Sequence, residues 1–346
     1  MYKEINIKTF LEKSRNIPVL DVRTPDEFRQ GHITEAINFP IFNTDERSVI
    51  GRTYQELGPD AAILKGFEFC SGRAGEFIKA GQRIAKDKSL LLHCWRGGIR
   101  SASLAWLFET AGIKSFTLKG GYKAYRRYAL KYIEHPFKLI VLGGMTGSGK
   151  TDILNNLKNL GFQVLELETL AHHKGSAFGA LGEKAQNSNE QFENDIFGFL
   201  YRSNPEEPVW VEDESRNIGK NLIPSVLFKQ ILNSPLICIE TETETRIDRL
   251  VRDYSEFPLE SLEFSIKKIS KRLGGLNTKT TLEYLEKGDF RKVAELMLDY
   301  YDKTYSYSLK KRNPDKVFLA EINSTDLKKA SDIVIKKAVL MGLIRN

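Results

Sequence analysis

The sequence predicts an α/β protein built from two parallel-sheet domains. Twice along the chain, an apolar run typical of a buried strand leads into a glycine-rich loop and then into a helical pattern, at residues 90–111 and again at residues 138–160. Strand–loop–helix units of this kind build folds with parallel sheets. The length of 346 residues suits two domains, and a hydrophobic content of 41% is enough for two cores.

Composition indicates a globular protein in a reducing compartment. No apolar run approaches the roughly 18 residues of a membrane span, and the first residues lack the pattern of a secretion signal. The three cysteines, Cys70, Cys94 and Cys238, lie far apart and have no metal-ligand spacing. We therefore expect a cytoplasmic protein with no membrane association and no metal site built from a cluster of its own side chains.

The first loop, within LLLHCWRGGIRSAS, has the features of an anion site. Leu90–Leu92 resemble the end of a buried strand, which places Cys94 at a strand-to-helix turn. Gly97 and Gly98 allow successive amide hydrogens to point inward, and the N-terminus of the next helix adds its partial positive charge. A thiolate at Cys94 should be stabilised there.

The side chains around this cysteine extend the prediction. Arg96 and Arg100 are expected to lower the pKa of Cys94 and to hold an anion delivered to the sulfur. Ser101 is expected to cap the helix that follows. The predicted catalytic residues are Cys94, Arg96 and Arg100, and the other loop residues predicted to surround the anion are Trp95, Gly97, Gly98 and Ile99.

The rest of the first domain, residues 1–130, reads as further strands and helices. Strands are predicted near Val19 and at Lys114–Leu118, and a helix at Glu76–Ala85. Arg47–Ala74 is rich in glycine and charge, so we expect an insertion without fixed structure. Residues 131–137 are expected to end a helical connector and form a linker, and residues 138–346 to form the second domain.

Positive charge is concentrated in the first part of the chain. Of the net charge of +7, residues 1–137 hold 22 Lys/Arg and 15 Asp/Glu, while residues 138–346 hold 30 of each. Residues 114–131 contain six basic residues, three tyrosines and no acid. Two interpretations stay open: an RNA surface, or an amphipathic connecting helix with solvated charges. The candidate RNA contacts are Lys123, Arg126, Arg127 and Lys131.

The second loop fits a phosphate-binding template. In KLIVLGGMTGSGKT, a strand at Lys138–Leu142 precedes the pattern G-x-x-x-x-G-K-[ST], and a helix is predicted at Asp152–Leu160. Such a P-loop wraps its amides around a diphosphate, its lysine offsets charge and its hydroxyl binds Mg²⁺. The predicted diphosphate-binding residues are Gly144, Gly147, Gly149, Lys150 and Thr151.

Further strands are predicted at Gln163–Leu167, Val209–Glu212 and Leu236–Glu240. The second of these runs into three consecutive acids, Glu212, Asp213 and Glu214. P-loop domains place a carboxylate that holds Mg²⁺ through water at such a position. Spacing does not distinguish which of the three acts in this way.

The five residues between Cys94 and Arg100 resemble the loop of cysteine phosphatases, and the loop is one residue longer than is usual in rhodanese domains. Upstream, PVLDVRTPDEF and GHITEAINFP resemble the two N-terminal signatures of rhodanese domains. This resemblance implies an N-terminal rhodanese-like parallel-sheet domain followed by a P-loop NTPase-like α/β domain. The longer loop suggests an anion larger than the usual sulfur donor.

The combination of HCWRGGIRS and GGMTGSGKT resembles the tRNA 2-selenouridine synthase family over essentially the whole chain. Similar supporting segments are LETLAHHKGSAFG, EDESRNIG, RLVRDY and RLGG. The resemblance implies replacement of the sulfur of wobble 2-thiouridine (U34) by selenium in tRNAs for Lys, Glu and Gln. It implies geranyl diphosphate and selenophosphate as substrates, no tightly bound cofactor, and an enzyme supplying selenophosphate as a candidate partner.

The resemblance also implies roles for the two loops. Geranylation of the sulfur would activate C2 of the base, with the P-loop holding the diphosphate of geranyl diphosphate and Mg²⁺ assisting. Cys94 would then take selenium as a selenopersulfide, while Arg96, Arg100 and the loop amides hold the departing phosphate.

Two other functions fit parts of the pattern. A cysteine phosphatase fused to a small-molecule kinase-like domain would use the same Cys-x5-Arg spacing and P-loop, but it leaves the basic connector unexplained. A non-catalytic tRNA-binding module is disfavoured by the intact nucleophile loop.

Overall fold

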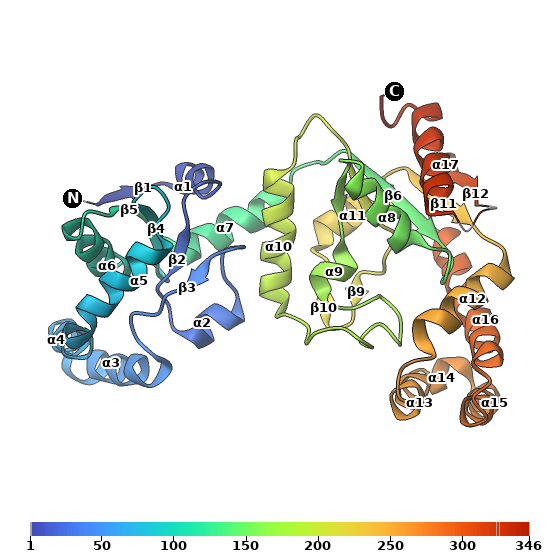
Figure 1. Cartoon of the computed structure of the whole chain (residues 1–346), viewed down its shortest axis with the longest axis horizontal. Coiled ribbons are helices and arrows are strands. Elements are labelled where there is room, and N and C mark those ends of the chain that lie inside the picture. Colours follow the sequence, from blue (N-terminus) through green and yellow to red (C-terminus); the bar gives the residue numbers. More distant parts are fainter. Residues whose placement is uncertain (1, 323, 325, 346) are drawn as a thin grey trace. The chain divides into compact units, whose positions relative to one another are not determined.

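The structure is a computed structural model that describes residues 2–322, 324 and 326–345. The chain forms two compact units (Figure 1). Unit 1 comprises Met1–Tyr132 and Glu193–Gly198, and unit 2 comprises Ile133–Phe192 and Phe199–Asn346. Each unit contains a five-stranded sheet in which all neighbouring strands are parallel, which confirms the predicted fold class.

The sheet of unit 1 has the strand order β1-β5-β4-β2-β3. Its strands are β1 (Lys3–Ile5), β2 (Val19–Asp21), β3 (Ile37–Asn38), β4 (Ser89–His93) and β5 (Lys114–Leu118). The central strand β4 is buried from Leu90 to His93, as expected for a parallel strand covered on both faces. Its carboxyl end carries Cys94, so the nucleophile loop leaves from the middle of the sheet.

The helices of unit 1 cover this sheet and extend beyond it. They are α1 (Ile7–Lys13), α2 (Pro25–Gln30), α3 (Thr44–Leu57), α4 (Pro59–Cys70), the short 3₁₀ helix η1 (Ser71–Arg73), α5 (Ala74–Ile84), α6 (Ile99–Thr110) and α7 (Gly121–Ile133). The helix predicted at residues 76–85 corresponds to α5.

The prediction of no fixed structure for residues 47–74 is wrong, because α3 and α4 pair there as a helical hairpin. Asn43 begins α3 with a capping box: its side chain accepts the amide of Glu46, whose carboxylate accepts the amide of Asn43. Pro59 occupies the first turn of α4, where its missing amide hydrogen costs nothing. The glycines and charges between these caps obscured a sparse apolar pattern at helical spacing.

Helix α7 is the predicted connector, and its inward face is packed. Tyr125, Ala129 and Ile133 are buried, and Tyr125 contacts Phe197 edge to face at 5.5 Å between ring centroids. Phe197 belongs to the short part of α10 (Asn189–Arg202) that groups with unit 1. A segment about 70 residues downstream thus completes the core around the connector.

The sheet of unit 2 has the strand order β12-β11-β6-β8-β7, with the strand of the P-loop in the centre. Its strands are β6 (Leu139–Gly144), β7 (Gln163–Leu165), β8 (Val209–Glu212), β11 (Leu236–Glu240) and β12 (Val317–Glu321). A separate antiparallel pair is formed by β9 (Asn217–Ile218) and β10 (Asn221–Leu222).

The helices of unit 2 follow these strands. They are α8 (Lys150–Asn159), α9 (Leu167–Ala171), α11 (Ser225–Asn233), α12 (Thr243–Tyr254), α13 (Leu259–Lys268), α14 (Ser270–Leu273), α15 (Gly275–Glu286), α16 (Phe290–Leu309), η2 (Pro314–Lys316) and α17 (Leu327–Leu340). Figure 1 shows α12 to α16 as a helical layer beside the sheet of this unit.

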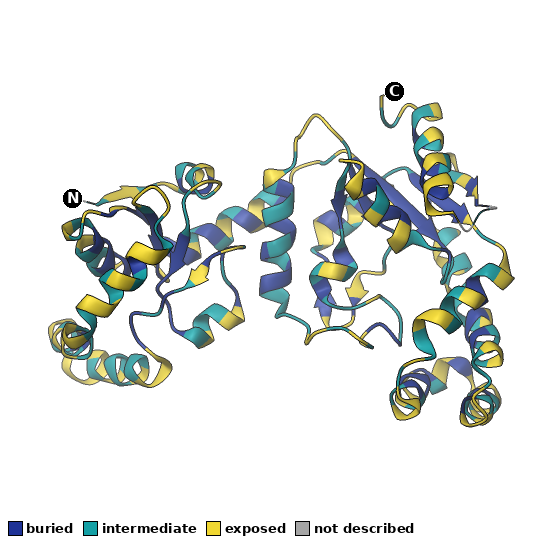
Figure 2. Ribbon diagram, in the orientation of Figure 1, coloured by how far each residue is buried: buried dark blue, intermediate teal, exposed yellow. Residues whose placement is uncertain are grey.

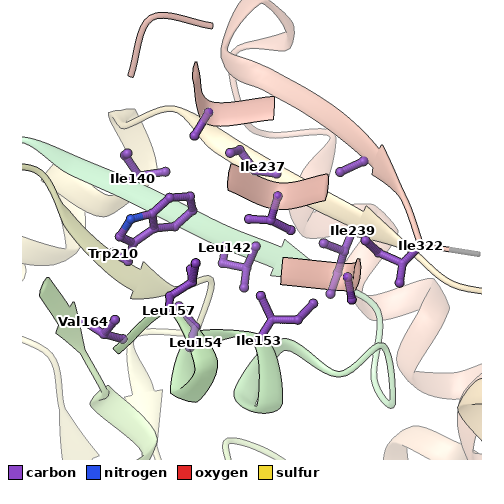
Figure 3. Close-up of a cluster of buried hydrophobic side chains, with 14 residues drawn as sticks. Ile140, Leu142, Ile153, Leu154, Leu157, Val164, Trp210, Ile237, Ile239 and Ile322 are labelled. Carbon is purple, nitrogen blue, oxygen red and sulfur yellow. The ribbon is translucent and has the colours of Figure 1, made fainter. Parts of the chain in front are cut away.

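The core of unit 2 fixes the position of the P-loop. Trp210 is fully buried and lies among Leu142 of β6, Leu157 of α8 and other aliphatic side chains (Figure 3). Figure 2 shows the central strands as the most deeply buried part of the unit. Because β6 and α8 both insert side chains into this cluster, the loop between them is anchored at both ends.

Candidate active sites

Cys94 lies immediately after β4, and its sulfur is surrounded by hydrogen-bond donors. Its Sγ accepts the amide of Gly98 at 3.2 Å and the hydroxyl of Ser101 at 3.3 Å. The expectation that Ser101 caps the next helix is wrong, because α6 begins at Ile99 with Gly98 as its N-cap. Ser101 therefore lies inside the first turn, where its hydroxyl reaches the sulfur.

These contacts favour the thiolate. Burial by itself raises the pKa of Cys94, but the hydrogen bond from Ser101, the charge of Arg100 and the amide of Gly98 outweigh it. The resulting pKa lies below the ordinary value for cysteine. By contrast, burial raises the pKa of Cys70, and also that of Cys238 in unit 2. Cys94 is thus the thiol prepared for nucleophilic chemistry.

The two arginines of the loop differ in their surroundings. Arg100 is largely buried, and its guanidinium donates to Glu27 at 2.8 Å, so its orientation is fixed. Arg96 is exposed, and among the described residues no hydrogen bond or ion pair holds its guanidinium. The expectation that both arginines lower the pKa of Cys94 is therefore met by Arg100 alone. Glu27, which orients Arg100, was missed by sequence reasoning although it lies within PVLDVRTPDEF.

Two glycines hold the loop against the start of α7. Gly97 has φ +68°, and a Cβ there would lie 2.6 Å from the carbonyl oxygen of Leu118. Gly121 has φ +58°, and its Cβ would lie 2.4 Å from the carbonyl oxygen of Cys94. The amide of Tyr122 donates to that same oxygen at 2.8 Å. The backbone approach requires glycine on both sides, while Trp95, Gly98 and Ile99 form the exposed rim of the loop.

Behind the loop lies a buried polar group. Arg23 and Asp21 form an ion pair of 2.6 Å with both side chains almost fully buried, and the guanidinium of Arg23 stacks on Tyr122 at 3.8 Å from the ring centroid. His93 is also fully buried; burial, outweighing the nearby Asp21, lowers its pKa to about 4. The imidazole is therefore neutral at pH 7 and acts as a structural support.

The basic connector divides into a packed part and an exposed part. Arg126 donates to Glu193 at 2.6 Å and to Asn194 at 2.7 Å, so its charge is compensated within unit 1. Lys123, Arg127 and Lys131 are exposed. This modifies the predicted set of RNA contacts, because the pairing of Arg126 is part of the fold.

The P-loop runs from the end of β6 to the start of α8, in the predicted order. Gly144, Gly147 and Gly149 all have positive φ, which lets the backbone curl with its amides inward. The ammonium of Lys150 donates to the carbonyl of Gly144 at 2.8 Å, folding back over the loop. Thr151 is exposed on the first turn of α8, where its hydroxyl is accessible.

Two arginines of α12 attach to the P-loop from outside. Arg246 donates to the carbonyl of Thr146 at 2.8 Å and pairs with Asp302 of α16 at 2.9 Å. Arg249 donates to the carbonyl of Gly147 at 2.6 Å. Neither residue was predicted from the sequence, although RLVRDY contains Arg249. The charge of Arg246 is compensated by Asp302, so Arg249 is the arginine of this pair that adds positive charge beside the loop.

The three consecutive acids at the end of β8, Glu212, Asp213 and Glu214, have different partners. Glu212 is buried and accepts the amide of Leu167 at 2.8 Å; burial and the nearby Glu168 raise its pKa to about 8. Asp213 pairs with Arg312 and accepts the hydroxyl of Tyr305 at 3.1 Å. Glu212 and Asp213 therefore bind other parts of the fold. Glu214 is the acid of the three that lies near Lys150 of the P-loop.

Glu214 interacts with Glu168 beside Lys150. Burial raises the pKa of both carboxyl groups, their mutual proximity adds to this for Glu214, and the charge of Lys150 opposes it. Two carboxyl groups this close repel each other when both are ionised, which favours binding of a proton or a cation between them. Glu168 belongs to LETLAHHKGSAFG, but nothing in that segment offered a physical reason to select it.

An apolar pocket opens beside the P-loop. Its empty volume is about 540 Å³, and it begins at Thr146 and Ser176. The interior lies among α12, α13 and α16, where the wall is mainly aliphatic and aromatic. Representative wall residues are Phe178, Leu250, Tyr254, Leu262, Met297 and Tyr301.

Two kinds of feature are absent from the part of the chain that the structure describes. Its side chains include no group of three or more His, Cys, Asp or Glu residues that could hold a metal ion. Across residues 2–322 and the described positions beyond, no helix combines the length and apolar character needed to cross a bilayer.

Comparison with known proteins assigns both units. Residues 7–128 match the family model of the rhodanese-like domain, and residues 137–330 match that of the tRNA 2-selenouridine synthase AAA domain. The solved N-terminal domain of a putative ATP/GTP binding protein from Clostridium difficile 630 is 35% identical, covering 37% of this chain and 99% of that chain with a TM-score of 0.35.

Relatives that match most of the chain are named tRNA 2-selenouridine synthase. The tRNA 2-selenouridine synthase of Nitrosomonas europaea is 34% identical over 355 residues, covering 87% of this chain and 91% of the relative. That of a Sulfurovum species is 36% identical over 338 residues, with the same coverage. The chain therefore belongs to the tRNA 2-selenouridine synthase family.

Proposed function

We propose that this protein converts wobble 2-thiouridine in tRNA to 2-selenouridine in two steps at two separate sites. Unit 2 transfers a geranyl group from geranyl diphosphate to the sulfur, and unit 1 replaces the geranylated sulfur with selenium from selenophosphate. Family membership supports the overall reaction. The observation that supports the division of labour is the apolar pocket at Thr146, next to a loop that binds diphosphates.

In the first step, the thiocarbonyl sulfur attacks C1 of geranyl diphosphate. A carbon–sulfur bond forms, the C1–oxygen bond breaks with its electron pair leaving on the diphosphate, and the N3 proton of the base is released to solvent. The amides of the P-loop, together with Lys150 and Arg249, offset the charge that develops on the leaving group. Backbone amides and lysine recognise only phosphate, so selection of a prenyl chain over a nucleotide depends on the apolar wall of the pocket.

The residues near the loop fit a Mg²⁺ ion. Thr151 presents an exposed hydroxyl, and the carboxyl groups of Glu168 and Glu214 lie beside Lys150. Magnesium usually combines one or two carboxylates with substrate phosphates and water, so this small donor set is sufficient. A bound Mg²⁺ would supply additional positive charge for diphosphate departure.

In the second step, Cys94 releases selenium from its donor. Attack of a thiolate on the selenium of selenophosphate would require phosphorus to leave with the bonding electrons as phosphite, so we do not retain the selenopersulfide implied by the resemblance. We place the attack at phosphorus. The sulfur–phosphorus bond forms, the phosphorus–selenium bond breaks, and hydrogen selenide leaves with the electron pair. Arg100 and the loop amides bind the phosphoryl oxygens, as the Cys-x5-Arg spacing suggests.

Hydrogen selenide then attacks C2 of the geranylated base. The carbon–selenium bond forms, the carbon–sulfur bond breaks, and geranyl thiolate leaves and is protonated. The selenium-bound proton is transferred to N3 to give 2-selenouridine, and water hydrolyses phosphocysteine to phosphate and free Cys94. Geranylation is needed because a neutral thiocarbonyl sulfur is a poor leaving group.

The test is reconstitution with the purified full-length protein. Wobble 2-thiouridine tRNA, geranyl diphosphate, selenophosphate and Mg²⁺ are combined without nucleotide, and digested nucleosides are analysed by mass spectrometry. We expect S-geranyl-2-thiouridine to appear first and 2-selenouridine to follow. A strict requirement for ATP would reject the role of the P-loop, and rapid turnover of a generic aryl phosphate without tRNA modification would favour the phosphatase alternative.

A further inference from the structure

A second apolar groove lies in unit 1, directly beside the Cys94 loop. Its empty volume is about 700 Å³, and its wall is formed by the α3–α4 hairpin and the first turn of α6. The residues that define it are Ile50, Tyr54, Ala62, Phe67, Ile99 and Arg100. No part of the first-step chemistry uses this groove, because geranyl diphosphate has its own pocket in unit 2.

The groove shares residues with the surroundings of Cys94. Ile99 directly follows Gly98, whose amide donates to the sulfur of Cys94 at 3.2 Å. Phe42 lines the groove and belongs to the same buried cluster as Cys94. A ligand in the groove therefore has one end at the rim of the nucleophile loop.

Large apolar side chains are exposed along this groove. The exposed fractions are 59% for Tyr54, 56% for Phe67 and 57% for Ile99. Three such side chains around one hollow form a continuous apolar surface, which folded proteins usually reserve for binding. Figure 2 shows the α3–α4 hairpin as a region of exposed and half-buried residues.

The charge distribution indicates an amphipathic ligand. Arg100, which pairs with Glu27 and interacts with the sulfur of Cys94, is the charged residue of the lining, while the α3–α4 wall is aliphatic and aromatic. A ligand that fits has a polar group at the nucleophile loop and a hydrocarbon chain extending between the two helices. In the second step, the base presented to this loop carries a ten-carbon geranyl chain on the sulfur that must leave.

We propose that this groove binds the geranyl chain of S-geranyl-2-thiouridine during selenium transfer. The inference rests on the proposed function and adds a second prenyl-binding site, distinct from the pocket beside the P-loop. Holding the chain here places C2 of the base at the Cys94 loop and distinguishes geranylated tRNA from unmodified tRNA. It also gives geranyl thiol a binding site after the carbon–sulfur bond breaks.

The size of the effect follows from burial of the chain. Each buried methylene contributes roughly a fourfold gain in affinity. A dimethylallyl thioether has the same allylic sulfur but is five carbons shorter than geranyl. Even partial burial of those carbons should give a preference for the geranyl substrate of at least about tenfold in kcat/KM.

The experiment uses the full-length protein and tRNA anticodon stem-loops carrying either S-geranyl-2-thiouridine or S-dimethylallyl-2-thiouridine. Selenation is measured with selenophosphate for the wild type, for Phe67→Glu and for Tyr54→Glu. Leu64→Glu is the matched control for Phe67→Glu. Leu64 also lies on α4 and is 64% exposed, but it does not line the groove. Turnover of the dimethylallyl substrate is the check that unit 1 of each variant is folded, and geranylation is measured as the check of unit 2.

We expect the wild type and Leu64→Glu to prefer the geranyl substrate by at least about tenfold. Phe67→Glu and Tyr54→Glu should lose most of this preference through a higher KM for the geranyl substrate, while the dimethylallyl substrate is little affected. Equal use of both substrates by the wild type, or an unchanged preference in both groove variants, would overturn the assignment while leaving the proposed function intact.

Two further outcomes are informative. If the groove variants lose activity equally on both substrates, the groove contacts the tRNA body or a protein partner, and the geranyl assignment is rejected. If the wild type selenates neither substrate, the proposed function itself fails, and the inference fails with it.

Discussion

The Cys94 loop and the P-loop differ in the source of the anion that they surround. In the Cys94 loop it is the sulfur of the protein's own Cys94, whereas the anion proposed for the P-loop is the diphosphate of a substrate. Both loops contain five residues, 94–98 between β4 and α6 and 145–149 between β6 and α8. Both leave the central strand of a parallel sheet and end at a helix N-terminus. The shared backbone arrangement therefore concentrates positive potential in the same way in each unit.

The two loops differ in the residues that directly follow β4 and β6. Cys94 follows β4, and its sulfur accepts a hydrogen bond from the amide of Gly98. Arg100, on the first turn of α6, is oriented by its ion pair with Glu27. After β6 the chain places Met145, and the cation Lys150 donates to the carbonyl of Gly144 and lies near the carboxyl groups of Glu168 and Glu214. The first loop therefore stabilises a charge on the protein itself, whereas the second holds donors and a cation in place for the charge of a bound diphosphate.

The largest expected effect comes from removing the nucleophile. Cys94→Ala should reduce selenation by at least about 10³-fold while geranylation is unchanged, because the first step uses only the other loop. Mass spectrometry of wobble nucleosides should show S-geranyl-2-thiouridine accumulating in the mutant. Normal levels of 2-selenouridine would show that Cys94 is not required.

Removing the cation of the P-loop tests the other half of the comparison. Lys150→Ala should lower geranylation by about 10²- to 10³-fold, because one charge opposite the leaving diphosphate is lost. Selenation of tRNA that already carries the geranyl group should persist. Lys158→Ala is the control, since Lys158 lies on the same helix but pairs with Glu166 away from the loop. Full geranylation by the Lys150 variant would contradict the assignment.

A smaller effect is expected from the donor that stabilises the thiolate. Ser101→Ala should raise the pKa of Cys94. Burial raises this pKa, and the variant lacks the Ser101 hydrogen bond that lowers it. The rate of alkylation of Cys94 falls as the pH falls through this pKa, so in the variant the decline should begin at a higher pH. Thr110→Ala, at the far end of α6, should leave the profile in place. Superimposable profiles for wild type and Ser101→Ala would remove Ser101 from the site.

The smallest effect concerns the connector. Replacing Lys123, Arg127 and Lys131 with Gln should reduce the slope of log affinity for tRNA against log salt by roughly two to three if all three contact phosphate. A salt titration with unchanged slope would identify α7 as a structural helix.

Arg126→Gln should instead lower the free energy of unfolding by about 1–3 kcal/mol, since Glu193 and Asn194 lose a charged donor.

The sequence by itself determined the fold class, the family and the positions of both loops. The family came from the resemblance of the motifs HCWRGGIRS and GGMTGSGKT. For the fold class and the loops, local pattern was sufficient, because a buried parallel strand is a continuous apolar run and the following glycines and helix are local in sequence. The strands around Leu90–Leu92 and Leu236–Glu240 formed as predicted for this reason. The α3–α4 hairpin was missed, because its capping box and sparse apolar pattern were interrupted by charges and glycines.

Only the tertiary structure decided which side chains act together. Glu27 meets Arg100 across 73 residues, Glu168 meets Glu214, and Arg126 is neutralised by Glu193. The acids after β8 are adjacent in sequence, yet Asp213 turns to Arg312 while Glu214 turns to the P-loop side. Local pattern carries no information about such pairs, because they depend on how distant segments pack, and the electrostatic environment of each group follows from that packing.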